Sequence, residues 1–190
     1  MKPLLIGLAG PARSGKSTAA DHLVRNHLLE HYAFADPLRS GLMEIFNLDP
    51  DDFEGERKEQ QLPWLGRSPR ELMQSMGTEW ARQMVNPDVW VNIAEQNLNY
   101  LQNSLSSVVG FVISDVRFEN EAELIRKRGG AIIHIHRPDA PAVNAHASEA
   151  GVLIRQDDLV ARNTSCLSSL RAQIDTCVEI IRYRAQRPAA

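Results

Sequence analysis

A glycine-rich segment near the start of the chain has the residue types and the spacing that bind a phosphate group. The pattern Gly10-x-x-x-x-Gly15-Lys16-Ser17 follows a short apolar run and precedes a helical pattern. Its glycines let the backbone fold so that successive N–H groups point at a β-phosphate, while the lysine reaches the β- and γ-phosphate oxygens and the serine hydroxyl ligates Mg²⁺. The segment therefore predicts a P-loop that binds a nucleoside triphosphate. The residues expected to contact this ligand are Gly10, Arg13, Ser14, Gly15, Lys16, Ser17 and Thr18.

Three polar residues are expected to lie close to the bound phosphates. Asp115 and Arg117 end an apolar strand-like run. At the tip of such a strand a carboxylate can hold a magnesium-bound water, and an arginine can clamp a phosphate. The alternatives are that Asp115 caps the next helix and that Arg117 forms a surface salt bridge. Arg13, inside the P-loop, would either stabilise charge on the transferring phosphoryl group or point to solvent.

Residues 70–82 predict a helix with a stripe of small and polar residues along one side. Facing a cleft, such a stripe would admit a flat base and a phosphate, and Arg70 and Arg82 are the candidate phosphate contacts. The same helix carries Met73, Met76 and Trp80, which we expect to pack into the core. The stripe consists of Arg70, Gln74, Gly77 and Ala81.

Asp36, Trp90 and Arg137 complete the set of candidate site residues. Asp36 directly follows a predicted strand and precedes Pro37, so it would either orient the attacking oxygen or cap the helix that the proline starts. Trp90 would either stack on a base or fill the core. Arg137 opens an irregular segment, 137–151, which we interpret as a lid from which the arginine reaches ATP.

The elements that must position these residues alternate between strands and helices. Strands are predicted at residues 4–9, 31–35, 108–114, 131–136 and near 158–162. Helices are predicted at 17–30, 37–47, 69–85, 89–105, 120–128 and 164–184, with Asn163 or Thr164 as the N-cap of the last. Such alternation indicates an α/β fold with a five-stranded parallel sheet and helices on both of its faces.

One interval departs from simple alternation. Residues 36–105 have almost no strand signal and include a charged, acidic stretch at 49–61. In a P-loop protein such an insertion would lie over the carboxyl ends of the strands, where ligands bind. We interpret it as a helical lobe that binds a second substrate, the phosphate acceptor, within a single domain spanning 1–190.

The composition favours one soluble domain that acts on a small substrate. The chain has 190 residues, 43% of them hydrophobic, and a formal net charge of −3. This charge gives no reason to expect a nucleic-acid polymer as partner. No apolar run suits a membrane span or a signal peptide, so the expected location is the cytoplasm. Cys166 and Cys177 lie in one predicted helix, beyond disulfide reach, and are expected to be reduced core thiols.

Five blocks of the sequence occur in a distinctive order. They are Gly-Pro-Ala-Arg-Ser-Gly-Lys-Ser-Thr at 10–18, Phe-Ala-Asp-Pro-Leu at 34–38, Met-Gly-Thr-Glu-Trp at 76–80, Asp-Val-Trp at 88–90 and Ser-Asp-Val-Arg-Phe-Glu-Asn-Glu-Ala at 114–122. With these blocks the chain resembles the bacteriophage-type deoxynucleoside monophosphate kinases, over residues 4 to about 175. The P-loop is shared with many enzymes, whereas the third and fifth blocks are much narrower in distribution.

This resemblance implies a P-loop nucleoside monophosphate kinase fold and transfer of the γ-phosphate of ATP to a deoxynucleoside monophosphate, with Mg²⁺. In that reaction we expect Lys16, Arg13, Asp115 and Arg137 to be catalytic, and Ser17 and Asp115 to hold the metal. The lid of such kinases is often rich in arginine, whereas residues 137–151 offer only Arg137 and His146. We therefore expect Arg13 to supply more of the positive charge that stabilises the transition state. The residues expected to bind the acceptor are Asp36, Arg70, Gln74, Arg82, Trp90 and Arg117.

Other functions remain open from the residues alone. A dephospho-CoA kinase has a related P-loop core, and only an acceptor assay separates it from the first interpretation. A non-enzymatic nucleotide-binding module would bind ATP without consuming it. A GTPase switch is disfavoured, because the residues after Asp115 supply no Asp-x-x-Gly and no Asn-Lys-x-Asp occurs in the chain. The oligomeric state is also open, with a homodimer as one option.

Overall fold

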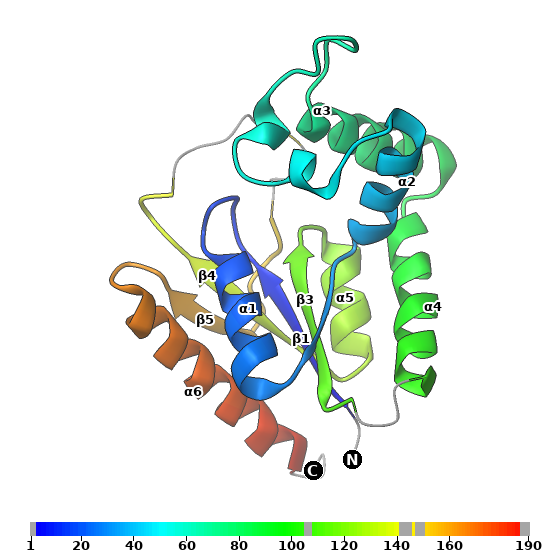
Figure 1. Ribbon diagram of the computed structural model, residues 1–190. Helices are drawn as coiled ribbons and strands as arrows, with labels where there is room; N and C mark the ends of the chain where they lie inside the picture. The colour runs from blue at the N-terminus through cyan, green and yellow to red at the C-terminus, as the bar shows by residue number, and fades with distance from the viewer. Residues whose placement is uncertain (1–2, 105–107, 141–145, 147–150, 187–190) are drawn as a thin grey trace.

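Five parallel strands form the centre of the molecule, a computed structural model that describes residues 3–104, 108–140, 146 and 151–186 (Figure 1). The strands lie in the order β2-β3-β1-β4-β5, and every neighbouring pair is parallel. Their bounds are Leu4–Ala9 for β1, Glu30–Tyr32 for β2, Gly110–Val116 for β3, Ala131–His136 for β4 and Leu159–Arg162 for β5. The predicted α/β fold with a five-stranded parallel sheet is confirmed.

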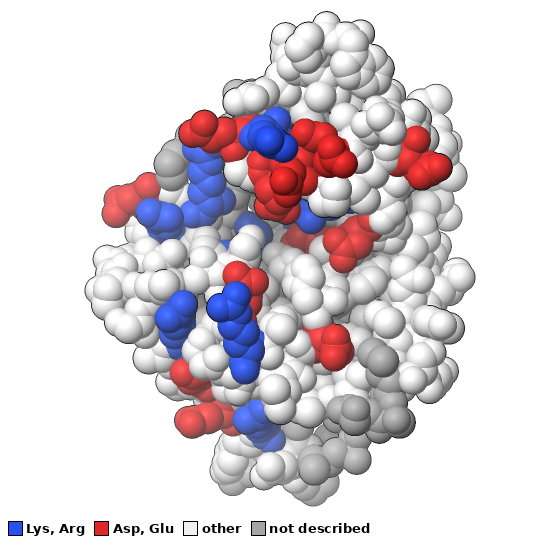
Figure 2. Space-filling view, viewed as in Figure 1, with Lys and Arg blue, Asp and Glu red and all other residues white. Residues whose placement is uncertain are grey.

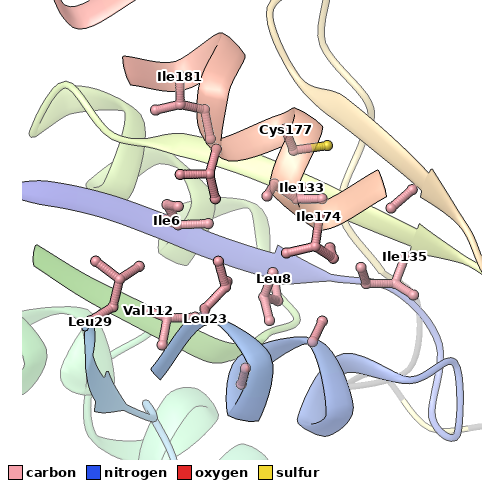
Figure 3. Packing of buried hydrophobic residues seen from close by; sticks show 14 of the residues in the cluster. Ile6, Leu8, Leu23, Leu29, Val112, Ile133, Ile135, Ile174, Cys177 and Ile181 are labelled. Atoms are coloured by element: carbon pink, nitrogen blue, oxygen red, sulfur yellow. The ribbon is translucent and has the colours of Figure 1, made fainter. Parts of the chain in front are cut away.

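Alternate residues of the strands point to opposite faces of the sheet, and helices cover both faces. Ile6 and Leu8 of β1 pack toward helices α1 and α6, as Figure 3 shows, whereas Leu5 and Ala9 pack toward α4 and α5. Because both faces are buried, the strands are nearly continuous apolar runs rather than alternating ones. The helix bounds are Lys16–His27 for α1, Val89–Ser104 for α4, Glu119–Lys127 for α5 and Leu167–Gln186 for α6.

The chain between β2 and α4 is mostly helical and lies over the carboxyl ends of the strands, whereas α4 packs on one face of the sheet (Figure 1). This helical segment has a small apolar core of its own, made of Leu38, Leu42, Leu48, Phe53 and Leu72. It therefore covers the edge of the sheet from which the P-loop extends. Before α4 its elements are α2 (Asp36–Phe46), the 3₁₀ turns η1 (Pro50–Phe53) and η2 (Arg57–Glu59), α3 (Pro69–Gln74) and η3 (Ser75–Val85).

The stretch predicted as one α-helix at 69–85 changes its winding halfway. After α3 it continues as η3, a π-helix, in which the N–H of Asn86 donates to the carbonyl of Ala81, five residues back, at 2.9 Å. More residues per turn shift which side chains share a face. Trp80, expected in the core, is 50% exposed. That prediction was wrong because it assumed α-helical spacing.

The last helix begins later than predicted. The N–H of Leu170 donates to the carbonyl of Cys166, so neither Asn163 nor Thr164 is the N-cap of α6. Cys166 precedes the helix and is exposed, whereas Cys177 is buried. The expectation of two core thiols therefore holds for Cys177 and is wrong for Cys166.

Within the described ranges, no helix has the length and the apolar character needed to span a bilayer. Of the segment interpreted as a lid, residues 141–145 and 147–150 lie outside the described residues.

Candidate active site

The segment after β1 has the backbone shape of a phosphate cradle. Gly10, Arg13 and Gly15 have positive φ angles of 141°, 62° and 107°. A Cβ at Gly10 would lie 2.5 Å from the carbonyl oxygen of Ile135, so no side chain fits there without a shift of the backbone. A positive φ is uncommon at a residue with a side chain and is found more often at functional sites. The backbone conformation of Arg13 therefore fits a functional role for this loop.

Lys16 is held inside this loop. Its Nζ donates to the carbonyl oxygens of Gly10 and Pro11, both at 2.7 Å. Ser14 is fully buried, and its hydroxyl oxygen has no hydrogen-bond partner within the part of the chain that the structure describes. The side-chain amide of Asn163, just after β5, donates to the carbonyl of Ser14 at 2.9 Å. Asn163 therefore braces the loop from outside, a role that its sequence position did not reveal.

Two of the predicted catalytic arginines meet at the same loop. Arg137, directly after β4, donates from its Nη1 to the carbonyl of Arg13 at 3.2 Å. Arg13 and Ser17 are exposed and Thr18 is half-buried. The parallel pairing of β1 with β4 accounts for this proximity, because the carboxyl ends of both strands lie at one edge of the sheet.

A pocket of about 850 Å³, counting its open mouth, lies under the helical segment beside the ends of β2 and β3. In the view of Figure 2, acidic and basic side chains gather around a hollow below that segment. The walls combine aromatic and apolar side chains with several cations, a mixture suited to a base and a phosphate. The lining residues that were predicted to bind the acceptor or a metal are Arg70, Gln74, Arg82, Trp90, Asp115 and Arg117.

Asp115 ties the end of β3 to the loop after β2. Its Oδ1 accepts the N–H of Phe34 at 2.8 Å, and its Oδ2 accepts the N–H of Ala35 at 3.0 Å. Asp36 does not line the pocket; its Oδ2 accepts the N–H of Ala33 at 3.0 Å. Burial, and then the negative charge of Asp115, raise the pKa of Asp36 above its ordinary value. The two carboxylates therefore accept hydrogen bonds from N–H groups of the same turn.

Trp90 spans the pocket wall and the core. Its indole Nε1 donates to the carbonyl of Gly77 in η3 at 2.8 Å, and its ring packs against the apolar core of the helical segment. A Cβ at Gly77 would lie 2.7 Å from a methyl carbon of Leu38, so the absence of a side chain there lets η3 approach α2 closely. Trp90 and Gly77 therefore shape the pocket independently of any contact with a ligand.

Arg82 and Glu121 form a buried ion pair at the back of the pocket. The Arg82 Nη2 donates to the Glu121 Oε1 at 2.5 Å, and the two residues are 8% and 3% exposed. Arg82 also donates to the carbonyl of Pro87 at 2.9 Å, and its guanidinium carbon lies 4.0 Å from the centroid of the Phe118 ring. The other carboxylate oxygen, Oε2, accepts the backbone N–H groups of Arg117 and Phe118 at 2.7 and 3.0 Å. Glu121 therefore fixes the turn that carries Arg117.

Burial, and then the negative charge of Asp115, raise the pKa of Glu121 to about 7, although Arg82 and the two N–H groups favour its charged form. The carboxylate is thus close to neutralisation near physiological pH.

The chain is similar to known proteins over nearly its whole length. The family model described as deoxynucleotide monophosphate kinase matches residues 59–174. A relative from Acanthamoeba polyphaga mimivirus, provisionally named a deoxynucleotide monophosphate kinase, is 33% identical over 93% of this chain and 96% of its own. The chain belongs to the deoxynucleotide monophosphate kinase family. The deoxynucleotide monophosphate kinase of Enterobacteria phage T4 is 26% identical, over 93% of this chain and 99% of that protein.

Solved structures share the fold of this chain. An unliganded sugar kinase from Janibacter sp. HTCC2649 matches 94% of this chain and 95% of its own, with 12% identity and a TM-score of 0.52. At that identity the likeness concerns the fold alone. The resemblance seen in the sequence, to the deoxynucleoside monophosphate kinases, is confirmed.

In this family member the sequence reasoning missed several residues that line the pocket. Arg39 and Lys58 add positive charge, and Arg70 is held by Glu59, whose two carboxylate oxygens both accept from its Nε at 2.8 Å. Burial, and then the charge of Arg70, lower the pKa of Lys58. Arg39 directly follows the Phe-Ala-Asp-Pro-Leu block, which was the one local signal available for it. The other missed lining residues with polar or aromatic groups are Phe34, Phe53, Thr78, Phe118 and Glu121.

Proposed function

We propose that this chain transfers the γ-phosphate of ATP to a deoxynucleoside monophosphate, giving the diphosphate. The observation that carries the proposal is the arrangement of two sites at one edge of the sheet. A P-loop follows β1, and a cation-rich, aromatic pocket adjoins the end of the neighbouring strand β3. Family membership favours this reaction over a dephospho-CoA kinase or a binding module.

On the donor side, the P-loop backbone cradles the phosphates of ATP. Its N–H groups, from Gly10 to Thr18, lie at the start of α1, where the helix dipole favours an anion. Lys16 exchanges the carbonyls of Gly10 and Pro11 for the β- and γ-phosphate oxygens. Arg13 and Arg137, which already contact each other, stabilise the charge that moves with the phosphoryl group.

The residues at the edge of the sheet fit Mg²⁺. The hydroxyl of Ser17 and the carboxylate of Asp115 are hard oxygen donors, and each Asp115 oxygen keeps a lone pair beyond its bond to one N–H group. Burial, and then the negative charge of Asp115, raise the pKa of Asp36, and a cation beside the two carboxylates would offset that charge. When bound, the ion neutralises charge on the β- and γ-phosphates.

On the acceptor side, Arg70 and Arg117 grip the phosphate of the monophosphate, and Trp90, Gln74 and the apolar wall receive the base. Because Arg82 is ion-paired with Glu121, its main role is to hold the pocket wall in place. It contributes less than Arg70 and Arg117 to binding of the acceptor. An acceptor phosphate is already anionic, so the reaction needs orientation and charge stabilisation more than a strong base.

The helical segment at about 36–105 then serves as the acceptor-binding lobe, and 137–151 as a lid, within one domain. ATP and deoxynucleotides are cytoplasmic metabolites, so we retain the cytoplasm as the site of action. A nucleic-acid polymer and a membrane have no part in this reaction, and a homodimer is compatible with it.

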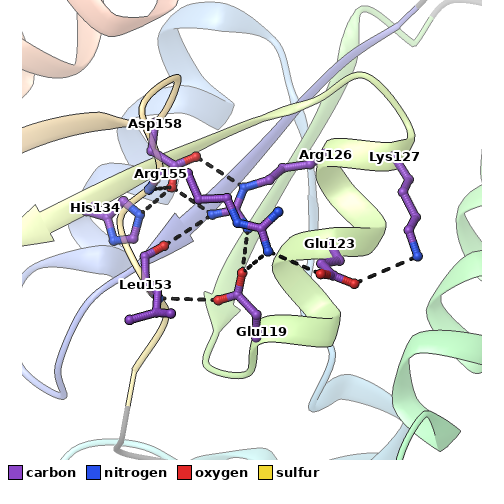
Figure 4. A network of polar contacts seen from close by, with 8 residues as sticks. All are labelled: Glu119, Glu123, Arg126, Lys127, His134, Leu153, Arg155 and Asp158. Atoms are coloured by element: carbon purple, nitrogen blue, oxygen red, sulfur yellow. Dashed lines mark hydrogen bonds and ion pairs between the residues drawn. The ribbon is translucent and has the colours of Figure 1, made fainter.

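The test is ADP release with ATP and Mg²⁺ against dGMP, dTMP, dCMP, dAMP, their ribose counterparts and dephospho-CoA. Turnover with a deoxynucleotide should fall at least about a hundredfold in Lys16→Ala, because the lysine contacts the transferred group. Lys127→Ala is the matched control, since its amine is exposed on α5, 3.8 Å from the Glu123 carboxylate (Figure 4). Acceptor-independent ATP binding alone, or turnover with dephospho-CoA alone, would replace the proposal by one of its alternatives.

A further inference from the structure

A cluster of metal-ligating side chains lies outside the proposed active site, where α1 meets α6. His22 and His27 of α1 each place Nε2 at 2.7 Å from the same carboxylate oxygen, Oδ1 of Asp175 in α6. The cluster begins six residues beyond Lys16 and ends eleven beyond it, about 9 to 16 Å along the helix. It is therefore separate from the phosphate cradle, which lies at the other end of α1.

The fold holds the two imidazoles in place before any ligand arrives. The His22 and His27 side chains are 6% and 13% exposed, and their rings meet edge to face with centroids 5.9 Å apart. The Asp175 side chain is 46% exposed, so the cluster is open to solvent on one side. Two rings in the helix interface and one accessible carboxylate thus form a preorganised set with an entry path.

Charge at this place also favours a cation. Asp175 supplies a carboxylate oxygen, a donor type that divalent metal ions bind. His27 is the last residue of α1, where the helix dipole presents its negative end.

The geometry suits a transition-metal ion. One ligand atom from each side chain lies within 4.8 Å of the others. Two ligands of one Zn²⁺ at bond lengths near 2.1 Å lie at most about 4.2 Å apart, so small side-chain rotations bring the three atoms into range. The nitrogen and oxygen donor set fits divalent zinc, and water reaching the open side completes four-coordination.

We propose that His22, His27 and Asp175 bind one divalent transition-metal ion, with Zn²⁺ as the best fit, and that the ion fastens α1 to α6. In the hydrogen-bonded state each Nε2 carries a proton and donates to the carboxylate. On metal binding each Nε2 gives its lone pair to the ion, and the ring proton resides on Nδ1 instead. No proton has to leave a neutral imidazole in this exchange of tautomers.

The test is calorimetric titration of the chelator-treated, full-length protein with Zn²⁺. All proteins carry Cys166→Ser, because this exposed thiol, whose pKa a hydrogen bond with Ser168 lowers to about 7, would bind zinc on its own. We expect one equivalent to bind, and the melting temperature to rise by roughly 5–10 °C at a hundredfold excess over Kd.

Two variants and a matched control decide the outcome. His27→Gln keeps an amide that can donate to Asp175 and so preserves the fold, and Asp175→Asn keeps the shape of the carboxylate. Each should weaken zinc binding by about tenfold or more. His31→Gln removes an exposed histidine on β2, bound to Ser114, and should leave zinc binding unchanged. Absence of saturable binding, or equal binding in His27→Gln, would overturn the proposal and leave only a hydrogen-bonded cluster.

Discussion

Replacing Glu121 by alanine should destabilise this kinase far more than replacing its partner Arg82 by methionine. Both side chains are buried, and they face each other at 2.5 Å. Arginine keeps its proton in any protein environment, whereas a carboxylate can neutralise itself by taking one. Removal of Glu121 therefore leaves a buried charge, and removal of Arg82 does not have to.

The magnitudes follow from what each variant leaves behind. In Glu121→Ala, Arg82 stays charged at 8% exposure, which costs about 3–5 kcal/mol in the free energy of unfolding. For a chain of this size that is a fall in melting temperature of about 6–20 °C. In Arg82→Met, Glu121, with its pKa already near 7, takes up a proton and keeps its bonds to the N–H groups of Arg117 and Phe118. The expected cost is about 1–3 kcal/mol.

The assay is urea denaturation at about pH 7.5, with the free energy of unfolding extrapolated to water. Glu121→Gln is the conservative control, since its amide oxygen can still accept a hydrogen bond from Arg82 or the Arg117–Phe118 turn. The double variant Arg82→Met with Glu121→Leu removes both charges, so its cost should be less than the sum of the single variants. A cost below about 1 kcal/mol for Glu121→Ala, or an equal or larger cost for Arg82→Met, would refute the reasoning.

Three further outcomes are expected. Asp115→Asn replaces one of two accepting oxygens by an amide group that faces a backbone N–H. We expect kcat/KM in the ADP-release assay to fall by about a hundredfold or more, with an unchanged far-ultraviolet circular dichroism spectrum. An unchanged rate would show that Asp115 is not part of the active site. Asn163→Ala loses the hydrogen bond to the Ser14 carbonyl, which is worth about 1 kcal/mol. ATP binding measured by calorimetry should therefore weaken about fivefold, whereas the KM for the acceptor should stay constant. The pKa of Glu121 is about 7 in the folded state and 4.5 ordinarily, so between pH 4.5 and 7 the folded state binds more protons than the unfolded state. The free energy of unfolding therefore falls as the pH rises through this range. Glu121→Gln should lose this part of the slope in urea titrations from pH 5 to 8, and parallel curves would contradict it.

The conformation of the P-loop was predictable because its information is local. The glycines of the P-loop and the lysine after them lie within eight consecutive positions, and each residue type has one conformational or chemical reason to be there. The sheet was predictable for a similar reason, since strands buried on both faces are continuous apolar runs. β1 and β4 match their predicted bounds at both ends.

The pocket beside the end of β3 was only partly predictable because its contacts cross long stretches of sequence. The pairing of Arg82 with Glu121 joins positions 39 residues apart, and that of Asp115 with Phe34 joins positions 81 apart. No periodicity reports such pairs. The π-helical winding of η3 was a second obstacle, since α-helical spacing placed Ala81 on the predicted stripe, while Thr78 and Arg82 line the pocket.

This contrast between local and distributed information bears on how acceptor choice can change. The pocket wall draws side chains from α2, η1, η2, α3, η3, α4, β3 and α5, so a substitution in one element alters the shape of the pocket while the phosphate cradle stays intact. The two cations that we propose bind the acceptor phosphate, Arg70 and Arg117, are each held by an acidic residue, through the Arg70 side chain and the Arg117 backbone. Base preference should therefore vary through apolar wall residues such as Leu38 and Met73, because exchanging these leaves no buried charge unpaired.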